Sequence, residues 1–390
     1  MVIISCSKKF HSFALAEQME KNGLLKSLYT TYAYPKNTLM RKFVKRVDKE
    51  DIPPNKIHTN IALAFPIKFN QAKAHIWNNL FDLWVAGKIP RSNSQLFIGW
   101  SGMSLHSIRA AKKQRMITIV ERGSSHILFQ NEILKEEYKK FNKNFSIHPL
   151  VIKKELKEYE EAAYISIPSG FVKNTFLQYG VNETKLIMNP YGARKPELFK
   201  AGQTSANKKK FTIVYLGTLS VRKGLIYLFE AISKLKLKTE DYEVWMIGKV
   251  EDEIHTIVNR FEKPNWKFFG HVNHYELPSY LSLCDIAVQP SIEEGLSMVI
   301  PQLMACGVPV IATTNTGGEE VIQDGVNGFI IPIRSPEEIT EKIEHLYNNP
   351  IELKEMKKAA GDIINNGMTW DDYGIRYIDF INKISCSNCI

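Results

Sequence analysis

The chain has 390 residues, more than one hydrophobic core usually holds, and this length predicts two or three domains. Its apolar content of 44% and charged content of 24% are those of an ordinary globular protein, and no apolar run approaches the length of a membrane span. The net charge of +10 favours an anionic substrate or lipid surface as partner, because the sequence carries no nucleic-acid-binding motif. Five cysteines, an odd and small number, argue against a disulfide framework.

The chain begins with a short apolar run that turns basic, the reverse of a secretory signal, so a cytoplasmic location is expected. Residues 1–6 have the composition of a buried strand, and residues 10–21 have helical spacing. The loop between them lies where the first strand of a doubly wound sheet meets its ligand. Lys8, Lys9 and His11 in this loop either meet an acceptor or form a solvated basic turn, and the sequence leaves both open.

Residues 39–47 (LMRKFVKRV) place five apolar side chains on one helical face and four cations, Arg41, Lys42, Lys45 and Arg46, on the other. This pattern is typical of an amphipathic helix lying on an anionic membrane surface. An amphipathic helix packed on its own domain has the same pattern, so both interpretations remain. The positive charge favours the membrane.

The rest of the first half alternates predicted strands and helices. Helices are expected over 74–86, 105–113, 134–141 and 151–162, and strands over 95–99, 116–120, 164–168 and 185–189. The apolar residues of 74–86 indicate a core helix, although they could also line the path of an acceptor. Residues 201–210 are polar and rich in lysine, which is typical of a linker.

The second half repeats the alternation. Strands are expected over 211–216, 243–248, 266–270, 285–290 and 308–313, and helices over 225–235, 297–306 and 369–383. The loop 217–224 follows the first of these strands and contains two glycines, Gly217 and Gly224, and two cations, Arg222 and Lys223. Such a loop is suited to a phosphate.

The loop 291–296 places Glu294 and Gly295 just before a predicted helix. A helix N-terminus offers unpaired N–H groups and a partial positive charge, both of which suit a phosphate. Gly295 allows the backbone to approach a ligand, and the Glu294 carboxylate accepts hydrogen bonds from hydroxyls. Hydroxyls beside phosphates indicate a sugar nucleotide.

At residues 285–318 the chain resembles the family 4 glycosyltransferases, enzymes of the GT-B fold. The family pattern contains a Glu-Gly pair, matched by Glu294 and Gly295, and a Gly-x-Pro-Val strand, matched from Gly307. The family has a second Glu eight positions after the first, whereas this chain has Gln302. The resemblance is close over most of the second half and loose over the first.

The loop 217–224 resembles the family's Gly-Arg-Leu and Lys-Gly loop, with Lys223 matched. Thr218 replaces the family's Arg, and Arg222 provides a second cation beside Lys223. The resemblance implies that these cations bind the donor diphosphate, that Glu294 contacts the donor sugar, and that Gln302 reaches the ribose without charge assistance. The implied donor-binding set is Gly217, Arg222, Lys223, Gly295, Leu296, Ser297 and Gln302.

The loop after the strand at 116–120 (ERGSSH) corresponds to a polar loop that faces the donor sugar across the cleft in the family. Either Arg122 or His126 takes this role by resemblance, and the choice stays open. For His126, a local hydrogen bond at a helix start is an equally good interpretation.

The resemblance predicts an α/β, GT-B fold in which two Rossmann-like, doubly wound parallel-sheet domains face a cleft. Residues 1–195 are expected to form the acceptor domain and residues 196–368 the donor domain. Residues 369–390 are expected to form a helix that packs back on the first domain.

The expected activity is transfer of a sugar from a nucleotide diphosphate sugar to a glycan or lipid-linked acceptor, with retention of configuration. Helix amides and two cations would replace a metal, and no cofactor beyond the nucleotide-sugar co-substrate is expected. The resemblance favours the synthesis of bacterial surface polysaccharide, such as capsule or lipopolysaccharide, or of glycolipid. The alternatives are a non-catalytic sugar-nucleotide-binding protein and a GT-B sugar-nucleotide epimerase.

Overall fold

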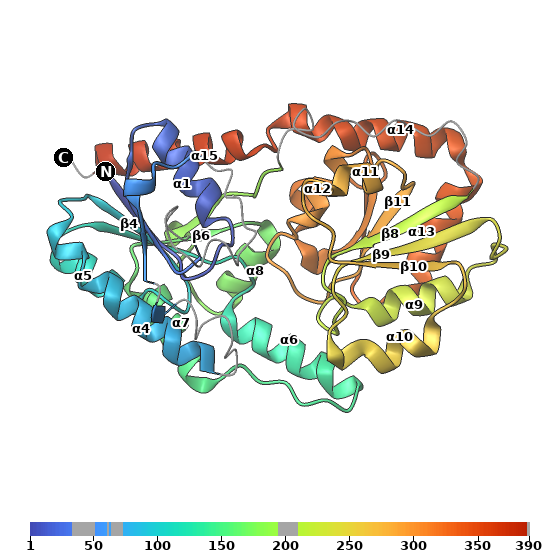
Figure 1. Ribbon diagram of the computed structural model, residues 1–390, viewed down its shortest axis with the longest axis horizontal. Helices are drawn as coiled ribbons and strands as arrows, with labels where there is room; N and C mark the ends of the chain where they lie inside the picture. The colour runs from blue at the N-terminus through green and yellow to red at the C-terminus, as the bar shows by residue number, and fades with distance from the viewer. Residues whose placement is uncertain (33–50, 61, 64–72, 194–209, 388–390) are drawn as a thin grey trace.

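The computed structural model describes residues 1–32, 51–60, 62–63, 73–193 and 210–387 (Figure 1). The basic segment 39–47 and nearly all of the predicted linker 201–210 lie outside these described residues. Within the described ranges, no helix combines the length and apolar character that crossing a membrane requires.

The first domain is built on a parallel sheet of seven strands in the order β3-β2-β1-β4-β5-β6-β7. Its strands are β1 (Val2–Ser5), β2 (Leu25–Thr30), β3 (Ile57–Thr59), β4 (Leu96–Trp100), β5 (Ile117–Glu121), β6 (Tyr164–Ile167) and β7 (Leu186–Met188). Helices cover both faces of this sheet: α1 (Ser12–Lys21), α4 (Ala74–Ala86), α5 (Leu105–Lys113), α6 (Ile127–Lys140), α7 (Pro149–Glu161) and α8 (Gly170–Gln178). The short apolar runs in the sequence form these strands because a sheet covered on both faces buries consecutive side chains.

The second domain contains a parallel sheet of six strands in the order β10-β9-β8-β11-β12-β13. These are β8 (Phe211–Leu216), β9 (Tyr242–Ile247), β10 (Trp266–Gly270), β11 (Ile286–Gln289), β12 (Val310–Thr313) and β13 (Gly328–Ile331). The helices are α9 (Leu225–Lys234), α10 (His255–Phe261), α11 (Leu277–Leu281), α12 (Val299–Ala305), α13 (Pro336–Asn348) and α14 (Pro350–Gly361). Two separate apolar clusters fill the two faces of this sheet, so the predicted pair of doubly wound domains is confirmed.

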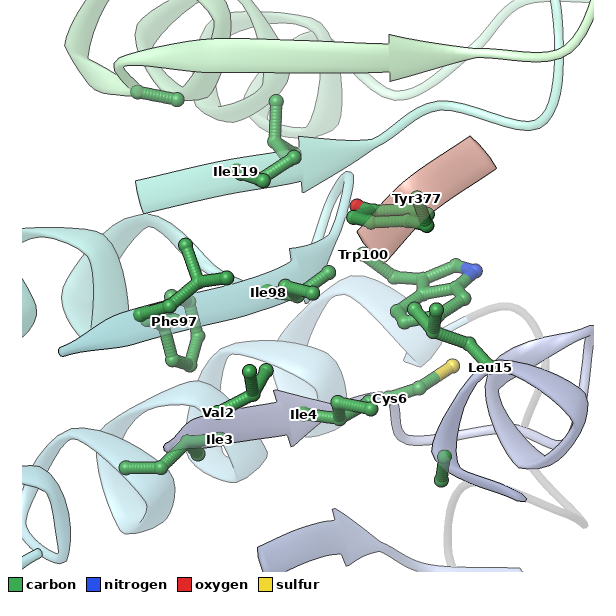
Figure 2. Packing of buried hydrophobic residues seen from close by; sticks show 14 of the residues in the cluster. Val2, Ile3, Ile4, Cys6, Leu15, Phe97, Ile98, Trp100, Ile119 and Tyr377 are labelled. Atoms are coloured by element: carbon green, nitrogen blue, oxygen red, sulfur yellow. The ribbon is translucent and has the colours of Figure 1, made fainter. Parts of the chain in front are cut away.

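The last helix, α15 (Trp370–Ser387), crosses from the second domain and lies along the first (Figure 1). Its Tyr377 is buried in the first core beside Trp100 and Ile98 (Figure 2), and its hydroxyl donates to Glu121 at 2.8 Å. At its start, Gln18 of α1 donates to Asp371 at 2.9 Å. The first domain is therefore completed by residues from the far end of the chain.

A second connection between the domains runs through α6, which reaches the second domain with its C-terminal half (Figure 1). Glu137 of α6 is fully buried and accepts hydrogen bonds from Tyr227 and Arg334, both at 2.7 Å. The neighbouring Tyr138 donates to Glu253 at 2.9 Å. The two domains are consequently in contact through α6 as well as through α15.

The helix predicted over 297–306 is shorter in the structure, where α12 begins at Val299 and ends at Ala305. Before α12, the Glu294 N–H donates to Asn315 O at 3.0 Å and the Ser297 N–H to Thr316 O at 2.9 Å, so these residues are held against the segment after β12. The predicted core helix at 74–86 is α4: Phe81 and Val85 are buried and Trp84 packs against the first core. Leu80, which was also expected in the core, is exposed.

Candidate functional site

The loops after β8 and β11 meet at the edge of the second sheet and bring together three of the predicted site residues. The Lys223 ammonium lies against Oε1 of Glu294 in an ion pair that lacks the alignment of a hydrogen bond. Arg222 Nη2 lies 3.5 Å from Oε2 of the same carboxylate. Gly224 makes this meeting possible, because it has a φ of +65° and a Cβ there would lie 2.0 Å from Pro290 O. The predicted cluster of one carboxylate and two cations is thus present.

Glu293, which the sequence analysis did not select, is the most highly coordinated side chain of the site. It is fully buried at the junction of the two domains. Its Oε1 accepts hydrogen bonds from Ser124 Oγ at 2.7 Å, Ser125 Oγ at 2.6 Å and Ser125 N–H at 3.0 Å. Its Oε2 accepts from Gln130 Nε2 and Arg222 Nε, both at 3.0 Å. Donors from both domains therefore converge on one carboxylate.

A nearby positive charge and several hydrogen bonds lower the pKa of Glu293 by more than burial raises it. Burial alone would raise the pKa of this carboxyl, but the Arg222 charge and the bonds from Ser125 and Ser124 lower the pKa to about 2. Burial also lowers the pKa of Arg222, and the Glu294 and Glu293 carboxylates more than compensate, so the pKa of Arg222 is raised. Glu293 and Arg222 therefore both carry their charges at neutral pH.

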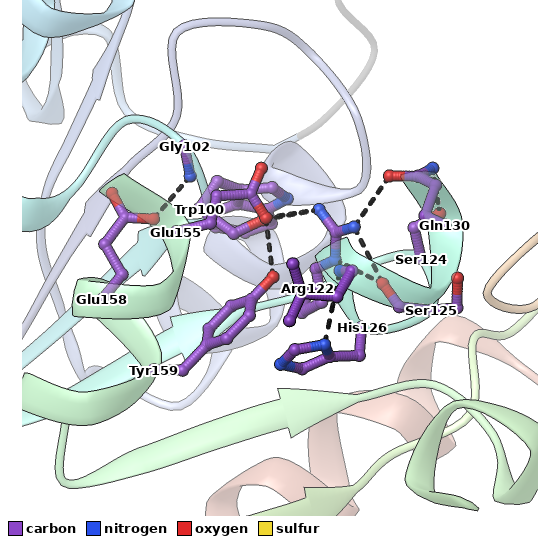
Figure 3. A network of polar contacts seen from close by, with 12 residues as sticks. Trp100, Gly102, Arg122, Ser124, Ser125, His126, Gln130, Glu155, Glu158 and Tyr159 are labelled. Carbon is purple, nitrogen blue, oxygen red and sulfur yellow. Dashed lines mark hydrogen bonds and ion pairs between the residues drawn. The ribbon is translucent and has the colours of Figure 1, made fainter. Parts of the chain in front are cut away.

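Arg122 points into the first domain and is almost entirely buried (Figure 3). Its guanidinium donates to Ser125 O at 2.9 and 2.8 Å, to Gln130 Oε1 at 2.9 Å and to Glu155 Oε2 at 2.7 Å. With its donors used in this way, Arg122 is placed to order the loop 122–125 and not to contact a sugar. The predicted direct role does not fit this geometry.

His126 occupies the N-cap position of α6, and its Nδ1 accepts from Leu128 N–H at 3.4 Å (Figure 3). Its ring stacks on Tyr179 with centroids 4.5 Å apart. Burial, with a smaller contribution from Arg122, lowers the pKa of His126 to about 4, so the ring is neutral at physiological pH. Of the two interpretations left open by the sequence, the structure favours the helix-start histidine.

The remaining predicted donor-binding residues are spread along the loops. Gly217 follows β8 with a φ of +138°, a conformation suited to glycine. Leu296 is buried in the core of the first domain, so the loop carrying Gly295 is inserted into the domain interface. Gln302 lies on α12, where it lines a small apolar pocket with Ala193 and His274. Because the Ser297 amide is already bonded, the predicted set of phosphate-binding amides is not complete.

A cleft of about 460 Å³ opens beside the two cations. Arg222, Lys223, Thr218 and Ser220 form one wall, and residues 251–253 with Tyr138 of the first domain form the rest. Its position gives a bound molecule access to Lys223 from the domain interface. In the part of the chain that the structure describes, no three His, Cys, Asp or Glu side chains gather closely enough to hold a metal ion.

Comparison with known proteins identifies the second domain with a described family. The family model "Glycosyl transferases group 1" matches residues 198–362. An uncharacterized 41.2 kDa protein in the cps region of Klebsiella pneumoniae is 25% identical over 62% of this chain and 70% of its own length. An uncharacterized glycosyltransferase of Methanocaldococcus jannaschii is 26% identical over 84% of this chain and 81% of its own length. Across the first four curated relatives, the match covers between 37% and 81% of the relative's length.

Solved structures share the whole fold at low sequence identity. Sucrose-phosphate synthase from Thermosynechococcus elongatus superposes with a TM-score of 0.78 and 15% identity, covering 99% of both chains. HepE of Anabaena, solved in complex with UDP-glucose, superposes with a TM-score of 0.70 and 14% identity, covering 98% of this chain and 99% of its own. These similarities confirm the predicted GT-B fold.

Proposed function

We propose that this chain, whose residues 198–362 match the family model "Glycosyl transferases group 1", transfers a sugar from a nucleotide diphosphate sugar to a glycan or lipid-linked acceptor. The observation that carries the proposal is the cluster of Lys223, Arg222 and Glu294 beside an open cleft. Two adjacent cations are suited to the two phosphates of such a donor, and the relative in a cps region supports surface polysaccharide as the product.

The geometry gives Glu294 two successive partners. In this structure its carboxylate neutralises both cations, so a diphosphate would compete with it for Lys223 and Arg222. Once displaced, the carboxylate is free to accept hydrogen bonds from the hydroxyls of the donor sugar. We infer that Glu294 orients the sugar while the two cations stabilise the charge that develops on the departing diphosphate.

The proposed reaction retains anomeric configuration and needs neither a metal ion nor a protein nucleophile. The acceptor hydroxyl would attack from the face that the leaving group departs, and a donor phosphate oxygen would take its proton. Lys223 and Arg222 supply the positive charge that a divalent ion would otherwise provide. Full activity in excess EDTA supports this assignment, and a loss of activity that Mg²⁺ or Mn²⁺ restores would overturn it.

The test compares Glu294→Gln and Lys223→Ala with the wild-type chain, using a panel of nucleotide sugars and measuring release of the nucleotide diphosphate. Glu294→Gln should lower turnover at least tenfold while changing nucleotide affinity little, since a hydrogen bond to a charged group contributes about 1.5–3 kcal/mol. Lys223→Ala should weaken UDP binding far more than uridine binding. Lys249→Ala is the matched control, because Lys249 is an exposed lysine of the same domain.

Two outcomes would contradict the proposal. Wild-type turnover by Glu294→Gln would remove that residue from the site. Binding of nucleotide sugars without any turnover, on a broad panel of acceptors, would favour a non-catalytic binding protein.

We also propose that the protein associates peripherally with the inner face of the cell membrane through residues 39–47. Near an anionic surface each Lys or Arg contributes about 1 kcal/mol, so four cations are enough for reversible attachment. Replacing Arg41, Lys42, Lys45 and Arg46 with Gln should abolish sedimentation with phosphatidylserine vesicles. Sedimentation equal to wild type would contradict the proposal.

A further inference from the structure

Glu293 accepts hydrogen bonds from both domains. The donors of the first domain form a contact between the domains, whereas the donor of the second domain is a proposed substrate-binding side chain. Ser124, Ser125 and Gln130 belong to the loop after β5 and to α6 of the first domain. Arg222 belongs to the loop after β8 of the second domain and is one of the two cations proposed to bind the donor diphosphate. The same carboxylate thus holds a domain contact and a substrate-binding side chain.

The first-domain donors are themselves held rigidly. Arg122 fixes the loop by donating twice to the Ser125 carbonyl, and it holds the Gln130 side chain at 2.9 Å (Figure 3). Glu155 anchors Arg122 from the other side at 2.7 Å and also accepts from Tyr159. The loop therefore presents its hydroxyls to Glu293 in a fixed arrangement.

Separation of the two domains would remove all of these first-domain donors at once. Of the five hydrogen-bond donors of the Glu293 carboxylate, only Arg222 Nε would then remain. Arg222 also lies near Glu294, so its guanidinium would be shared between two carboxylates and would be less available to a diphosphate. When the domains close, the hydroxyl and amide donors of the first domain bond to the Glu293 carboxylate. Arg222 is then more available to a diphosphate.

We propose that Glu293 is a positioning residue that couples closure of the two domains to the alignment of Arg222. In the closed arrangement, Arg222 Nε stays bonded to the Glu293 carboxylate and to its backbone carbonyl at 2.9 Å. Its Nη2 then lies 3.5 Å from Glu294 Oε2, where the diphosphate is proposed to bind, and 3.5 Å from Ser124 Oγ of the first domain. This inference deepens the proposed function and rests on it for the identity of the ligand.

A matched contact distinguishes this coupling from a general effect on closure. Glu320 of the second domain accepts from the Gly170 backbone N–H of the first domain at 2.6 Å, so it also joins the domains. None of the polar contacts described for Glu320 involves Arg222. Glu320→Gln therefore weakens the domain contact without disturbing the proposed alignment.

The experiment measures how much Arg222→Ala lowers kcat in three backgrounds: wild type, Glu293→Gln and Glu320→Gln. Because Glu293 is proposed to act through Arg222, Arg222→Ala should lower kcat at least tenfold less in the Glu293→Gln background than in wild type. In the Glu320→Gln background its effect should match wild type within twofold. UDP affinity should also fall in Glu293→Gln, because Arg222 is then less available to the diphosphate. Equal effects of Arg222→Ala in all three backgrounds would overturn the proposal.

A second measurement needs no turnover and so separates this inference from the proposed function. Small-angle X-ray scattering of the full chain with UDP should give a larger radius of gyration for Glu293→Gln and for Ser124→Ala/Ser125→Ala than for wild type. The protein with all three substitutions should have the same radius of gyration as the two variants, because each variant disrupts the same contact between the domains. Additive expansion, or wild-type dimensions for both variants, would show that Glu293 does not hold the domains together. Absence of turnover in wild type, with this pattern intact, would contradict the proposed function alone.

Discussion

Glu293 and Glu158 are both completely buried, yet their pKa values are shifted in opposite directions from the ordinary value of a glutamate. The pKa of Glu293 is lowered from 4.5 to about 2, whereas burial raises the pKa of Glu158 from 4.5 to about 8. Glu158 accepts from the backbone amides of Gly102 at 2.5 Å and Ser104 at 2.7 Å (Figure 3). These two bonds and the charge of Lys154 do not offset burial and the nearby carboxylate of Glu155.

The difference teaches that the partners of a buried carboxyl, and not its burial, decide whether it keeps its charge. Glu293 has five hydrogen-bond donors, one of which is the Arg222 guanidinium. Glu158 is bonded to the loop that begins α5 and holds a proton at neutral pH, so it acts there as a neutral structural group. A permanently charged group at the domain interface suits coupling between domains, whereas a neutral one suits the interior of a single domain.

The largest effect is expected from Arg222→Met, which would make the surroundings of Glu293 resemble those of Glu158. Removing one partner of a buried ion pair costs about 3–5 kcal/mol of unfolding free energy. The pKa of Glu293 should rise above its ordinary value, so stability should fall as the pH rises through neutrality. Urea denaturation between pH 5 and pH 8 measures both effects, and a flat pH profile would contradict the comparison.

A smaller loss, about 2–3 kcal/mol at pH 7, is expected from Glu293→Gln, since hydrogen bonds to a charged group are replaced by neutral ones. The pKa of Glu293 is lowered on folding, so its contribution is complete above pH 4.5 and disappears as the pH falls toward 2. Urea midpoints of the two proteins should therefore converge between pH 4.5 and pH 3. A gap that stays constant over this range would show that Glu293 is not charged in the folded protein.

Ser125→Ala should cost about 1.5 kcal/mol, because it removes one hydroxyl bond to the carboxylate and leaves the Ser125 amide bond in place. In the Glu293→Gln background the same substitution should cost less, since a neutral acceptor forms a weaker bond. Thermal and urea unfolding of the four proteins in this double-mutant cycle give the coupling. Strict additivity would argue against a direct bond.

The smallest effect is expected from Glu158→Gln, which should change stability by less than about 1 kcal/mol at pH 5, where Glu158 is neutral. The folded protein holds a proton here that the unfolded chain has lost, so wild type loses stability as the pH rises from 4.5 to 8. The variant should not show this loss and should become the more stable protein near pH 8. Parallel pH profiles of wild type and variant would contradict the raised pKa.

The sequence determined the local elements of this protein. The apolar run at 211–216 became β8 with the predicted bounds, and those at 1–6 and 285–290 became β1 and β11 with small differences at the ends. Three strands, β2, β3 and β13, were not predicted. The edge strand β3 was missed because its three residues are only half buried and form no apolar run. The motif around Glu294 and Lys223 was also recognisable, since it lies within two short loops whose residue types are read directly.

Tertiary structure alone decided the surroundings of Glu293, Arg122 and His126. Glu293 and Glu294 are neighbours of the same residue type, and nothing local distinguishes the one that is fully buried from the one that faces the cations. The donors that hold Glu293 ionised lie up to 169 positions away in the sequence. Likewise, Glu155 on α7 turns Arg122 inward, and Tyr179 and Thr175 fix His126. Strand and helix patterns depend on neighbouring residues, whereas the charge and direction of a buried side chain depend on groups that only the folded chain brings together.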